Sequence, residues 1–269
     1  MRTIIHISDL HFGRADSIVL EPLIGAIDHL RPDLIAVSGD LTQRARPEQF
    51  RCARQFLDRL AYPRIVVPGN HDVPLYNVFA RFSSPLRHYE RYITPDLAPF
   101  FRDDEIAVLG INTARSFTLK GGRINASQVA GARARFGEVP AEVLKIVVTH
   151  HPFDVPAKTH ERELVGRAGM AMEALAQCGV DMLLSGHLHA GRVATTGARF
   201  AIEGHAALVI QAGTATSTRT RNEFNAFNVV RTGPDTAMIE QHIWNPGTRR
   251  YEPAGFERFR SNAGQWVRI

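Results

Sequence analysis

The amino-acid sequence predicts an α/β-type domain, and three observations support this prediction. Apolar, strand-like runs alternate with segments of helical spacing through the first half of the chain. Short β-type runs separated by Gly, Asn and Pro follow after residue 188. Residue types that bind metals stand directly after several of the expected strands. Alternating strand and helix favours βαβ units with parallel pairing, and the later runs favour antiparallel pairing.

The elements of the first half are expected in a regular order. An apolar, β-branched strand covers residues 3–8, and the helical stripe of residues 17–30 follows it. A second strand covers 33–38. A helix with Pro near its first turn covers 47–60, and a third strand covers 64–68. This order predicts a parallel sheet with helices in the crossovers.

Residues 74–104 interrupt this order, because aromatic residues there stand among several Pro and Arg. We expect irregular helical segments packed over one face of the domain, and a lid over an acyl chain, formed by residues 79–101, is the alternative. The remaining strands are expected over 105–112, 143–149 and 180–185, the remaining helices over 126–136 and 162–178, and the antiparallel β-type runs over 191–196, 198–203, 206–212, 224–231 and 236–243. Residues 245–269 are polar and show no clear period.

The composition is that of an ordinary globular protein, with 44% hydrophobic and 22% charged residues among 269. We expect one domain over 1–245 and a C-terminal tail, 246–269, that packs on it or extends it. No apolar run is long enough to span a bilayer, and residues 1–5 lack a signal-peptide cleavage site, so a cytoplasmic location is expected.

The net charge of +5 and the pI of about 9.6 favour anionic partners in general. Because the basic residues are scattered, nucleic-acid binding is permitted but not indicated. The late strands could pair across the edge of a homodimer.

Metal-ligand residue types recur at five strand ends. The five stretches are Asp9-Leu10-His11, Gly39-Asp40, Gly69-Asn70-His71-Asp72, His150-His151 and Gly186-His187-Leu188-His189. Ligands of open α/β sheets bind outside the carboxyl ends of the strands, so all five stretches would converge on one place. A lone D-x-H arises by chance, and a strand-end Asp often only caps a helix, but five stretches in order are hard to obtain by chance.

The chemistry of these side chains indicates divalent cations. Carboxylate, amide oxygen and imidazole suit Zn, Fe, Mn or Co. Residues i and i+2 of an extended segment point the same way, so Asp9 with His11, and His187 with His189, would each face one cavity. The glycines that precede Asp40, Asn70 and His187 permit close approach of the backbone to ions and phosphate.

The order D-x-H, G-D, G-N-H-D, H-H-P and G-H-x-H resembles the pattern of the calcineurin-like metallophosphoesterases, with all five blocks present between residues 9 and 189. The resemblance implies a four-layer αββα sandwich with two central mixed sheets flanked by helices. It also implies two divalent ions per chain. One ion is held by Asp9, His11 and His189, the other by Asn70, His150 and His187, and Asp40 bridges both.

The same resemblance implies a reaction mechanism. A hydroxide that bridges the two ions attacks phosphorus in line, and the ions spread the charge that builds on the phosphoryl oxygens. His71 would contact the phosphate and help the leaving oxygen depart, with Asp72 orienting its ring.

Within the superfamily, the stretches I-S-D-L-H-F, V-P-G-N-H-D and L-L-S-G-H-L-H are most similar to bacterial class III cyclic-nucleotide phosphodiesterases. This similarity implies hydrolysis of a small phosphodiester, with 3′,5′-cyclic nucleotides as candidate substrates. Three alternatives remain: a lipid A precursor (UDP-diacylglucosamine) pyrophosphohydrolase, a nuclease of the superfamily, and a non-catalytic scaffold. The pyrophosphohydrolase usually has Arg in place of His71, the nucleases carry an extra capping domain, and the scaffolds lose ligands that are present here.

Three further residues are candidates for substrate contact at the pocket rim. His151 directly follows a predicted ligand and could line the pocket or only buttress the loop. Arg219 and Arg221 lie in a polar stretch after Gly213, where guanidinium groups would suit an anionic substrate. A solvated loop or an oligomer contact is the alternative for both arginines.

Overall fold

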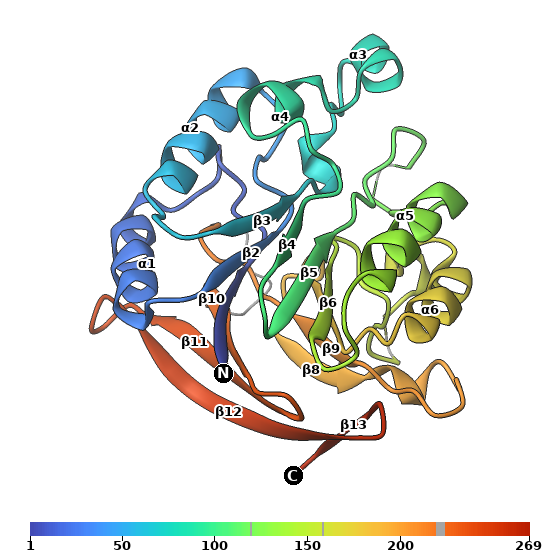
Figure 1. The fold of residues 1–269 in the computed structure, drawn as a ribbon. Helices are drawn as coiled ribbons and strands as arrows, with labels where there is room; N and C mark the ends of the chain where they lie inside the picture. The colour runs from blue at the N-terminus through green and yellow to red at the C-terminus, as the bar shows by residue number, and fades with distance from the viewer. Residues whose placement is uncertain (119, 158, 219–223) are drawn as a thin grey trace.

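The computed structural model describes residues 1–118, 120–157, 159–218 and 224–269, and it contains two central β-sheets (Figure 1). The seven-stranded sheet has the order β13-β12-β11-β10-β1-β2-β3 and the six-stranded sheet the order β4-β5-β6-β7-β9-β8. The first consists of β1 (Arg2–Ile7), β2 (Leu34–Ser38), β3 (Arg64–Val67), β10 (Ala226–Thr232), β11 (Thr236–Asn245), β12 (Arg250–Asn262) and β13 (Gln265–Arg268). The second consists of β4 (Phe100–Arg102), β5 (Ile106–Gly110), β6 (Leu144–Val148), β7 (Met182–Ser185), β8 (Arg192–Thr195) and β9 (Leu208–Gln211).

The helices lie outside the two sheets, as Figure 1 shows. They are α1 (Ser17–Leu30), α2 (Pro47–Asp58), α3 (Val78–Ser83), α4 (Arg87–Tyr92), α5 (Ala126–Gly137) and α6 (Ala168–Gln177), with 3₁₀ turns η1 (Asn70–Asp72), η2 (Glu161–Glu163) and η3 (Thr196–Ala198). None of the helices in the described ranges has the length and hydrophobicity that crossing a bilayer requires.

Alternation along the strands builds the layers. Ile4 of β1 packs into the core between the sheets, whereas its neighbour Ile5 packs against the helices that cover the first sheet. Val147 of β6 faces a third core beneath α5 and α6, and its neighbour Ile146 faces the first sheet. Both faces of these strands are therefore buried, which confirms the four-layer αββα sandwich with two mixed sheets.

Three sequence predictions differ from the structure. Residues 164–167 do not continue the helix predicted over 162–178, because the backbone N–H groups of Val165 and Gly166 donate to Pro152 and Gly122, and α6 begins only at Ala168. Residues 198–203 are not a strand but part of the connection between β8 and β9. The strand predicted over 206–212 is β9, which pairs parallel with β7 as well as antiparallel with β8.

The C-terminal residues, which show no period in sequence, form β12 and β13 at one edge of the first sheet. Most of β12 is exposed or half-buried, and its buried hydrophobic residues are Tyr251 and Phe259. A strand with so few buried residues has little apolar alternation, so pattern analysis misses it.

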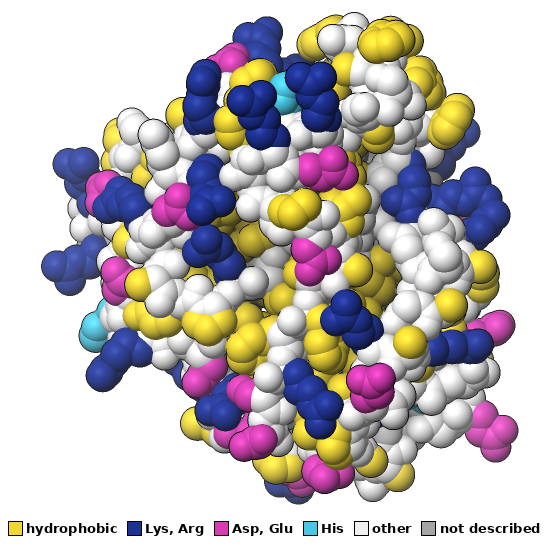
Figure 2. Space-filling model, turned by 45° about the horizontal axis from the view of Figure 1, so that its top comes forward, with side chains coloured by type: hydrophobic (Ala, Val, Ile, Leu, Met, Phe, Trp, Pro, Cys, Tyr) yellow, Lys and Arg dark blue, Asp and Glu magenta, His cyan; other side chains and the backbone are white. Residues whose placement is uncertain are grey.

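The segment of residues 74–104 forms α3, α4 and β4. Tyr89 is fully buried, and its hydroxyl donates to the Val66 carbonyl, so α4 is a part of the core. By contrast, Phe79 and Phe82 of α3 are exposed. Hydrophobic side chains accordingly gather near the top of Figure 2, at the end of the molecule that carries α3.

Candidate metal centre

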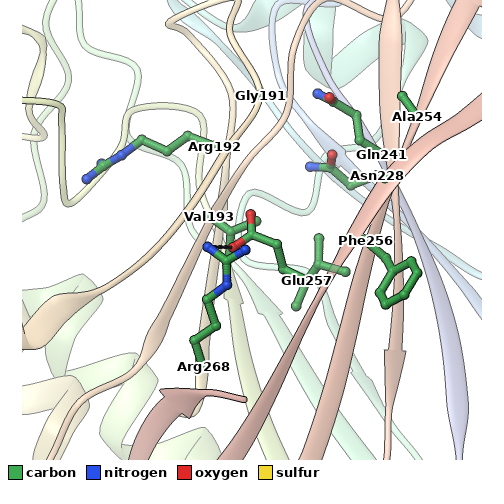
Figure 3. A pocket seen from close by; sticks show the side chains of 11 residues that line it. Gly191, Arg192, Val193, Asn228, Gln241, Ala254, Phe256, Glu257 and Arg268 are labelled. Carbon is green, nitrogen blue, oxygen red and sulfur yellow. Dashed lines mark ion pairs between the residues drawn. The ribbon is translucent and has the colours of Figure 1, made fainter.

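One cavity of about 250 Å³ lies between β8 and the inner face of β11 and β12 (Figure 3). Its charged side chains are paired with other protein groups. Glu257 and Arg268 form an ion pair of 3.1 Å across it, and Arg192 points away from it to donate to Asp154 at 2.7 Å. The cavity therefore offers no converging set of free polar groups.

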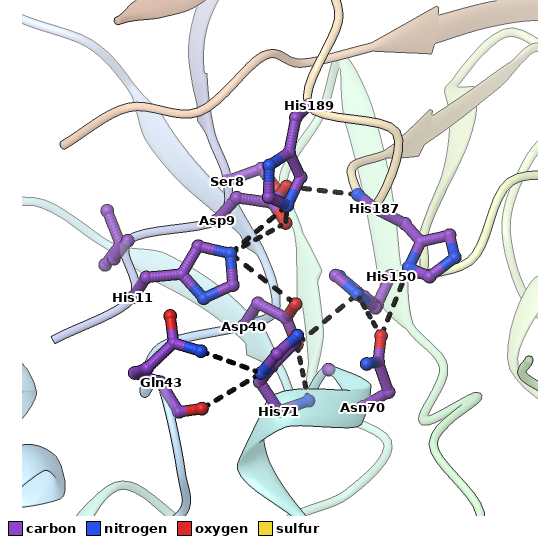
Figure 4. Close-up of polar contacts among 12 residues, drawn as sticks. Ser8, Asp9, His11, Asp40, Gln43, Asn70, His71, His150, His187 and His189 are labelled. Carbon is purple, nitrogen blue, oxygen red and sulfur yellow. Dashed lines mark hydrogen bonds and ion pairs between the residues drawn. The ribbon is translucent and has the colours of Figure 1, made fainter. Parts of the chain in front are cut away.

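The predicted ligand residues meet instead at the carboxyl ends of the parallel strands (Figure 4). β1, β2 and β3 pair parallel, and so do β5, β6 and β7, so the loops that follow these strands open at one end. Ligand atoms of Asp9, His11, Asp40 and His189 all lie within 4.8 Å of one another. We call these four residues the first group.

Most distances within the first group match those between ligands of a common ion. His189 Nε2 lies 3.2 Å from both His11 Nε2 and Asp9 Oδ1. His11 Nε2 lies 3.6 Å from Asp9 Oδ1 and 3.8 Å from Asp40 Oδ2. Ligands about 2.0–2.2 Å from a shared ion are themselves separated by roughly 3.0–3.6 Å.

The second group consists of Asp40, Asn70, His150 and His187. Asn70 Oδ1 lies 3.1 Å from both His150 Nε2 and His187 Nδ1, and His150 Nε2 lies 3.4 Å from Asp40 Oδ1. The two oxygens of Asp40 thus face different groups, Oδ1 the second and Oδ2 the first.

The hydrogen bonds of the second group show that it suits a cation. His150 Nδ1 lies 2.8 Å from the Ser38 carbonyl, which can only accept, so Nδ1 donates to it and the neutral ring, the form that binds metals, presents a bare Nε2. In the same way His187 Nε2 donates to Glu163 at 2.7 Å and leaves Nδ1 bare. In the neutral rings both bare nitrogens face the Asn70 oxygen, and a cation relieves this opposition of acceptor atoms. A proton on His150 Nε2 takes the place of that cation in the metal-free protein.

The electrostatics of the buried groups support the same conclusion. Burial alone would raise the pKa values of Asp9 and Asp40, but neighbouring imidazoles outweigh burial and hold both below the ordinary range. Burial disfavours the charged form of His150, but the Asp40 carboxylate outweighs burial and raises the pKa of His150 to about 9. Positive charge is therefore favoured between these groups.

The backbone at the candidate ligands adopts an unusual conformation. Asp9, His11, Asp40, His187 and His189 all have positive φ, between 48° and 73°. The D-x-H and G-H-x-H segments are therefore turns and not extended, so the alternation expected from the sequence is not what brings their side chains together. Left-handed backbone costs about 1–3 kcal/mol at a residue other than glycine, and it concentrates at functional sites.

Two glycines make these turns possible. Gly39 has φ +87°, and a Cβ there would lie 2.8 Å from His150 Nδ1. A Cβ on Gly186 would lie 1.8 Å from Ser8 Oγ, which donates to Asp9 Oδ2 at 2.7 Å. Any larger side chain would therefore displace a candidate ligand or its partner.

His71 lies beside the first group, with its ring centroid 5.0 Å from that of His11. Its Nδ1 lies 2.9 Å from the Gln43 carbonyl. The Asp72 carboxylate instead accepts hydrogen bonds from the backbone of Leu41, Thr42 and Gly69 and from the Thr42 hydroxyl. The orienting acceptor at His71 is thus Gln43, while Asp72 joins the loop after β2 to the loop after β3.

His151 is fully buried, and hydrogen bonds occupy both of its ring nitrogens. Nε2 donates to the Lys120 carbonyl at 2.8 Å, and Nδ1 lies 2.8 Å from the Thr113 hydroxyl. Burial lowers the pKa of His151 well below the ordinary value, so the ring is neutral. These contacts favour the buttressing of the loop, the second of the two roles considered for His151 from the sequence.

Three residues that contact the candidate ligands or His71 carried no sequence signal: Ser38, Gln43 and Glu163. Ser38 and Gln43 act through their backbone carbonyls, and Glu163 acts from a turn that is distant in sequence. Neither kind of contact leaves a sequence motif next to the candidate ligands. Arg219 and Arg221, candidates for substrate contact, lie outside the described residues.

Comparisons with known proteins agree with this geometry. The family model of the calcineurin-like phosphoesterases matches residues 2–191. A cAMP/cGMP dual specificity phosphodiesterase of Mycobacterium tuberculosis is 28% identical over 267 residues, covering 87% of this chain and 77% of that protein. The glycerophosphodiester phosphodiesterase GpdQ of Enterobacter lignolyticus is 42% identical over 82 residues, which cover 25% of this chain and only 28% of that relative.

The fold is also found in a dimetal phosphatase from Danio rerio. That structure is 14% identical with a TM-score of 0.63, covering 94% of this chain and 98% of that one. The family-model match covers well over half of the chain and includes all the strand ends that carry the candidate ligands. The chain belongs to the calcineurin-like phosphoesterase family.

Proposed function

We propose that the protein hydrolyses phosphodiesters with two divalent ions. The observation that carries the proposal is the position of Asp40, whose two carboxylate oxygens face two separate groups of ligand atoms. Asp9, His11 and His189 would complete one ion site, and Asn70, His150 and His187 the other. When bound, such ions supply a nucleophile at neutral pH and compensate the charge that develops on the phosphoryl oxygens.

The protein's own groups would act around the reacting phosphate. With Nδ1 of His71 donating to the Gln43 carbonyl, Nε2 is the atom that, in the protonated ring, would give its proton to the leaving oxygen. Asp72 would hold Asp40 and His71 in fixed positions relative to each other, because its carboxylate joins the backbone of the two loops that carry them.

For the substrate, we propose a small phosphodiester, and a 3′,5′-cyclic nucleotide in particular. The similarity to the mycobacterial phosphodiesterase over most of both chains supports this choice. The shorter but stronger similarity to the glycerophosphodiesterase supports glycerophosphodiesters as the second candidate.

The test uses metal-stripped protein to which Mn²⁺ is returned. Bis(p-nitrophenyl) phosphate and p-nitrophenyl phosphate distinguish diester from monoester hydrolysis, and cAMP, cGMP and glycerophosphocholine distinguish the substrate classes. We expect Mn²⁺-dependent turnover of the diester well above that of the monoester. Protein that holds two ions per chain but turns over none of the diesters would refute the proposal.

A further inference from the structure

The large apolar side chains that are most exposed near the metal centre belong to two segments. They are Tyr76, Val78, Phe79, Phe82 and Phe117, with exposed fractions of 74%, 63%, 83%, 51% and 89%. We call these five residues the aromatic rim. The first four lie on α3 and the turn before it, and Phe117 lies on the loop after β5.

A buried arginine joins the two segments of the aromatic rim. The Arg81 side chain is almost fully buried, and its guanidinium donates to the carbonyls of Pro74, Ser116 and Thr118 at 2.6–2.8 Å. The rings of Phe82 and Phe117 lie 5.2 Å apart. The rim is therefore built on a fixed base, and its exposure follows from the fold.

Two chains of contacts link the rim to the candidate metal centre. Arg44 lies over the Tyr76 ring at 5.7 Å, and the adjacent Gln43 carbonyl holds His71. In the second chain of contacts, the loop that carries Phe117 continues to Lys120, whose carbonyl accepts from His151. Whatever the rim contacts is therefore brought close to the mouth of the metal centre.

The two segments that carry the aromatic rim are mostly positively charged. Apart from the buried Arg81, residues 74–92 and 113–123 contain the cations Arg87, Arg91, Arg115, Lys120 and Arg123, and one acid, Glu90. Lys and Arg side chains stand beside the hydrophobic side chains at the top of Figure 2. An anionic partner complements this surface.

We propose that the aromatic rim docks the mouth of the metal centre onto an anionic lipid bilayer. Phe and Tyr side chains that project among basic residues can enter the boundary between headgroups and acyl chains. The surrounding Arg and Lys side chains would pair with anionic headgroups. The inference goes beyond the proposed reaction and does not depend on its substrate.

Two other occupants fit the rim less well. A second copy related by a two-fold axis would place like charges opposite one another, which opposes association. Single-stranded nucleic acid stacks its bases on ring faces along a basic groove. Here the rings of Phe82 and Phe117 are inclined by 58°, and the exposed side chains belong to a short helix and a loop.

The test is co-sedimentation of the full chain with vesicles of phosphatidylcholine, with and without phosphatidylglycerol. The rim variant is Phe79→Ser/Phe117→Ser. The matched control is Met170→Ser/Phe256→Ser, which removes two exposed apolar side chains elsewhere, 37% and 58% exposed. Turnover of bis(p-nitrophenyl) phosphate in solution verifies that each variant is folded, because neither pair is assigned to the reaction.

We expect the wild type and the control to sediment with the vesicles that contain phosphatidylglycerol, more weakly at high salt. The rim variant should lose roughly tenfold or more in partition coefficient at unchanged turnover. The proposal is overturned if the wild type does not bind anionic vesicles, or if the rim variant binds as well as the control. It is equally overturned if the rim substitutions abolish only dimerisation or oligonucleotide binding.

Discussion

The loops of the metal centre and the aromatic rim both depart from the rule that folded proteins bury apolar side chains and expose polar ones, but they do so in opposite ways. At the metal centre, carboxylates and imidazoles are buried on left-handed backbone. At the rim, Phe79 and Phe117 are more exposed than most polar residues of a folded protein. Both arrangements reduce stability, and such departures are expected at sites that a function requires.

The largest expected effect separates these two regions directly. Asp40→Asn keeps the side-chain volume and an acceptor for the backbone N–H of His71. It removes the negative charge that faces the first and second groups of candidate ligands. We expect turnover of bis(p-nitrophenyl) phosphate to fall by roughly a thousandfold or more. Steady-state kinetics would measure this, with the rim variant as the comparison. Equal losses in both variants would remove the functional distinction between the regions.

His71→Gln tests whether a half-buried residue between the two regions belongs to the reaction or to ion binding. We propose that His71, oriented by the Gln43 carbonyl, acts on the leaving oxygen and does not bind an ion. We therefore expect His71→Gln to lower kcat roughly a hundredfold at unchanged metal content. Kinetics and metal analysis of the same sample would test this. Loss of metal in parallel with activity would instead make His71 a ligand.

Glu163 tests how strongly the surroundings of the ligands matter. Its carboxylate accepts from His187 Nε2, so Glu163→Ala should weaken Mn²⁺ binding roughly tenfold, and Glu163→Gln should restore part of the loss. Calorimetric titration of metal-free protein would measure the affinities. Glu161→Ala is the control, because the Glu161 side chain is 86% exposed on the same turn. An equal loss in the control would contradict the assignment.

A smaller effect concerns the stability of the buried region. Burial lowers the pKa of His6 from 6.5 to about 3, so the unfolded chain takes up a proton near pH 6.5 that the folded chain refuses. The free energy of unfolding that depends on buried, neutral His6 therefore falls as pH decreases below 6.5, by about 1.4 kcal/mol per pH unit. His6→Gln should reduce the pH dependence of urea unfolding of metal-free protein by that slope. The exposed His160→Gln should not, and an unchanged slope in His6→Gln would contradict the account.

The same comparison explains what the sequence can predict. The candidate ligands follow strand ends in a fixed order, so the sequence predicts that these residues meet. The resemblance to the calcineurin-like pattern adds their division into two groups and the two-sheet fold. The backbone that joins them could not, because the left-handed turns at Asp9 and His187 leave no pattern of alternation. The Gln43 carbonyl and the Glu163 side chain contribute through contacts that only the folded chain creates.

The rim could not be predicted because an aromatic residue has the same meaning in sequence whether it is buried or exposed. Phe79 and Tyr89 lie ten residues apart in one aromatic segment, and one is 83% exposed while the other is fully buried. The difference arises at Arg81, whose hydrogen bonds to the Ser116 and Thr118 carbonyls hold α3 against the loop of Phe117.

The most direct test of the central claim is electron paramagnetic resonance of the Mn²⁺-loaded protein, with the metal content of the same sample. If Asp40 joins two ion sites, two Mn²⁺ ions per chain will give the spectrum of an exchange-coupled pair. Asp40→Asn will then lose that coupling. A single bound ion per chain, or two ions that remain uncoupled in the wild type, would contradict the shared centre.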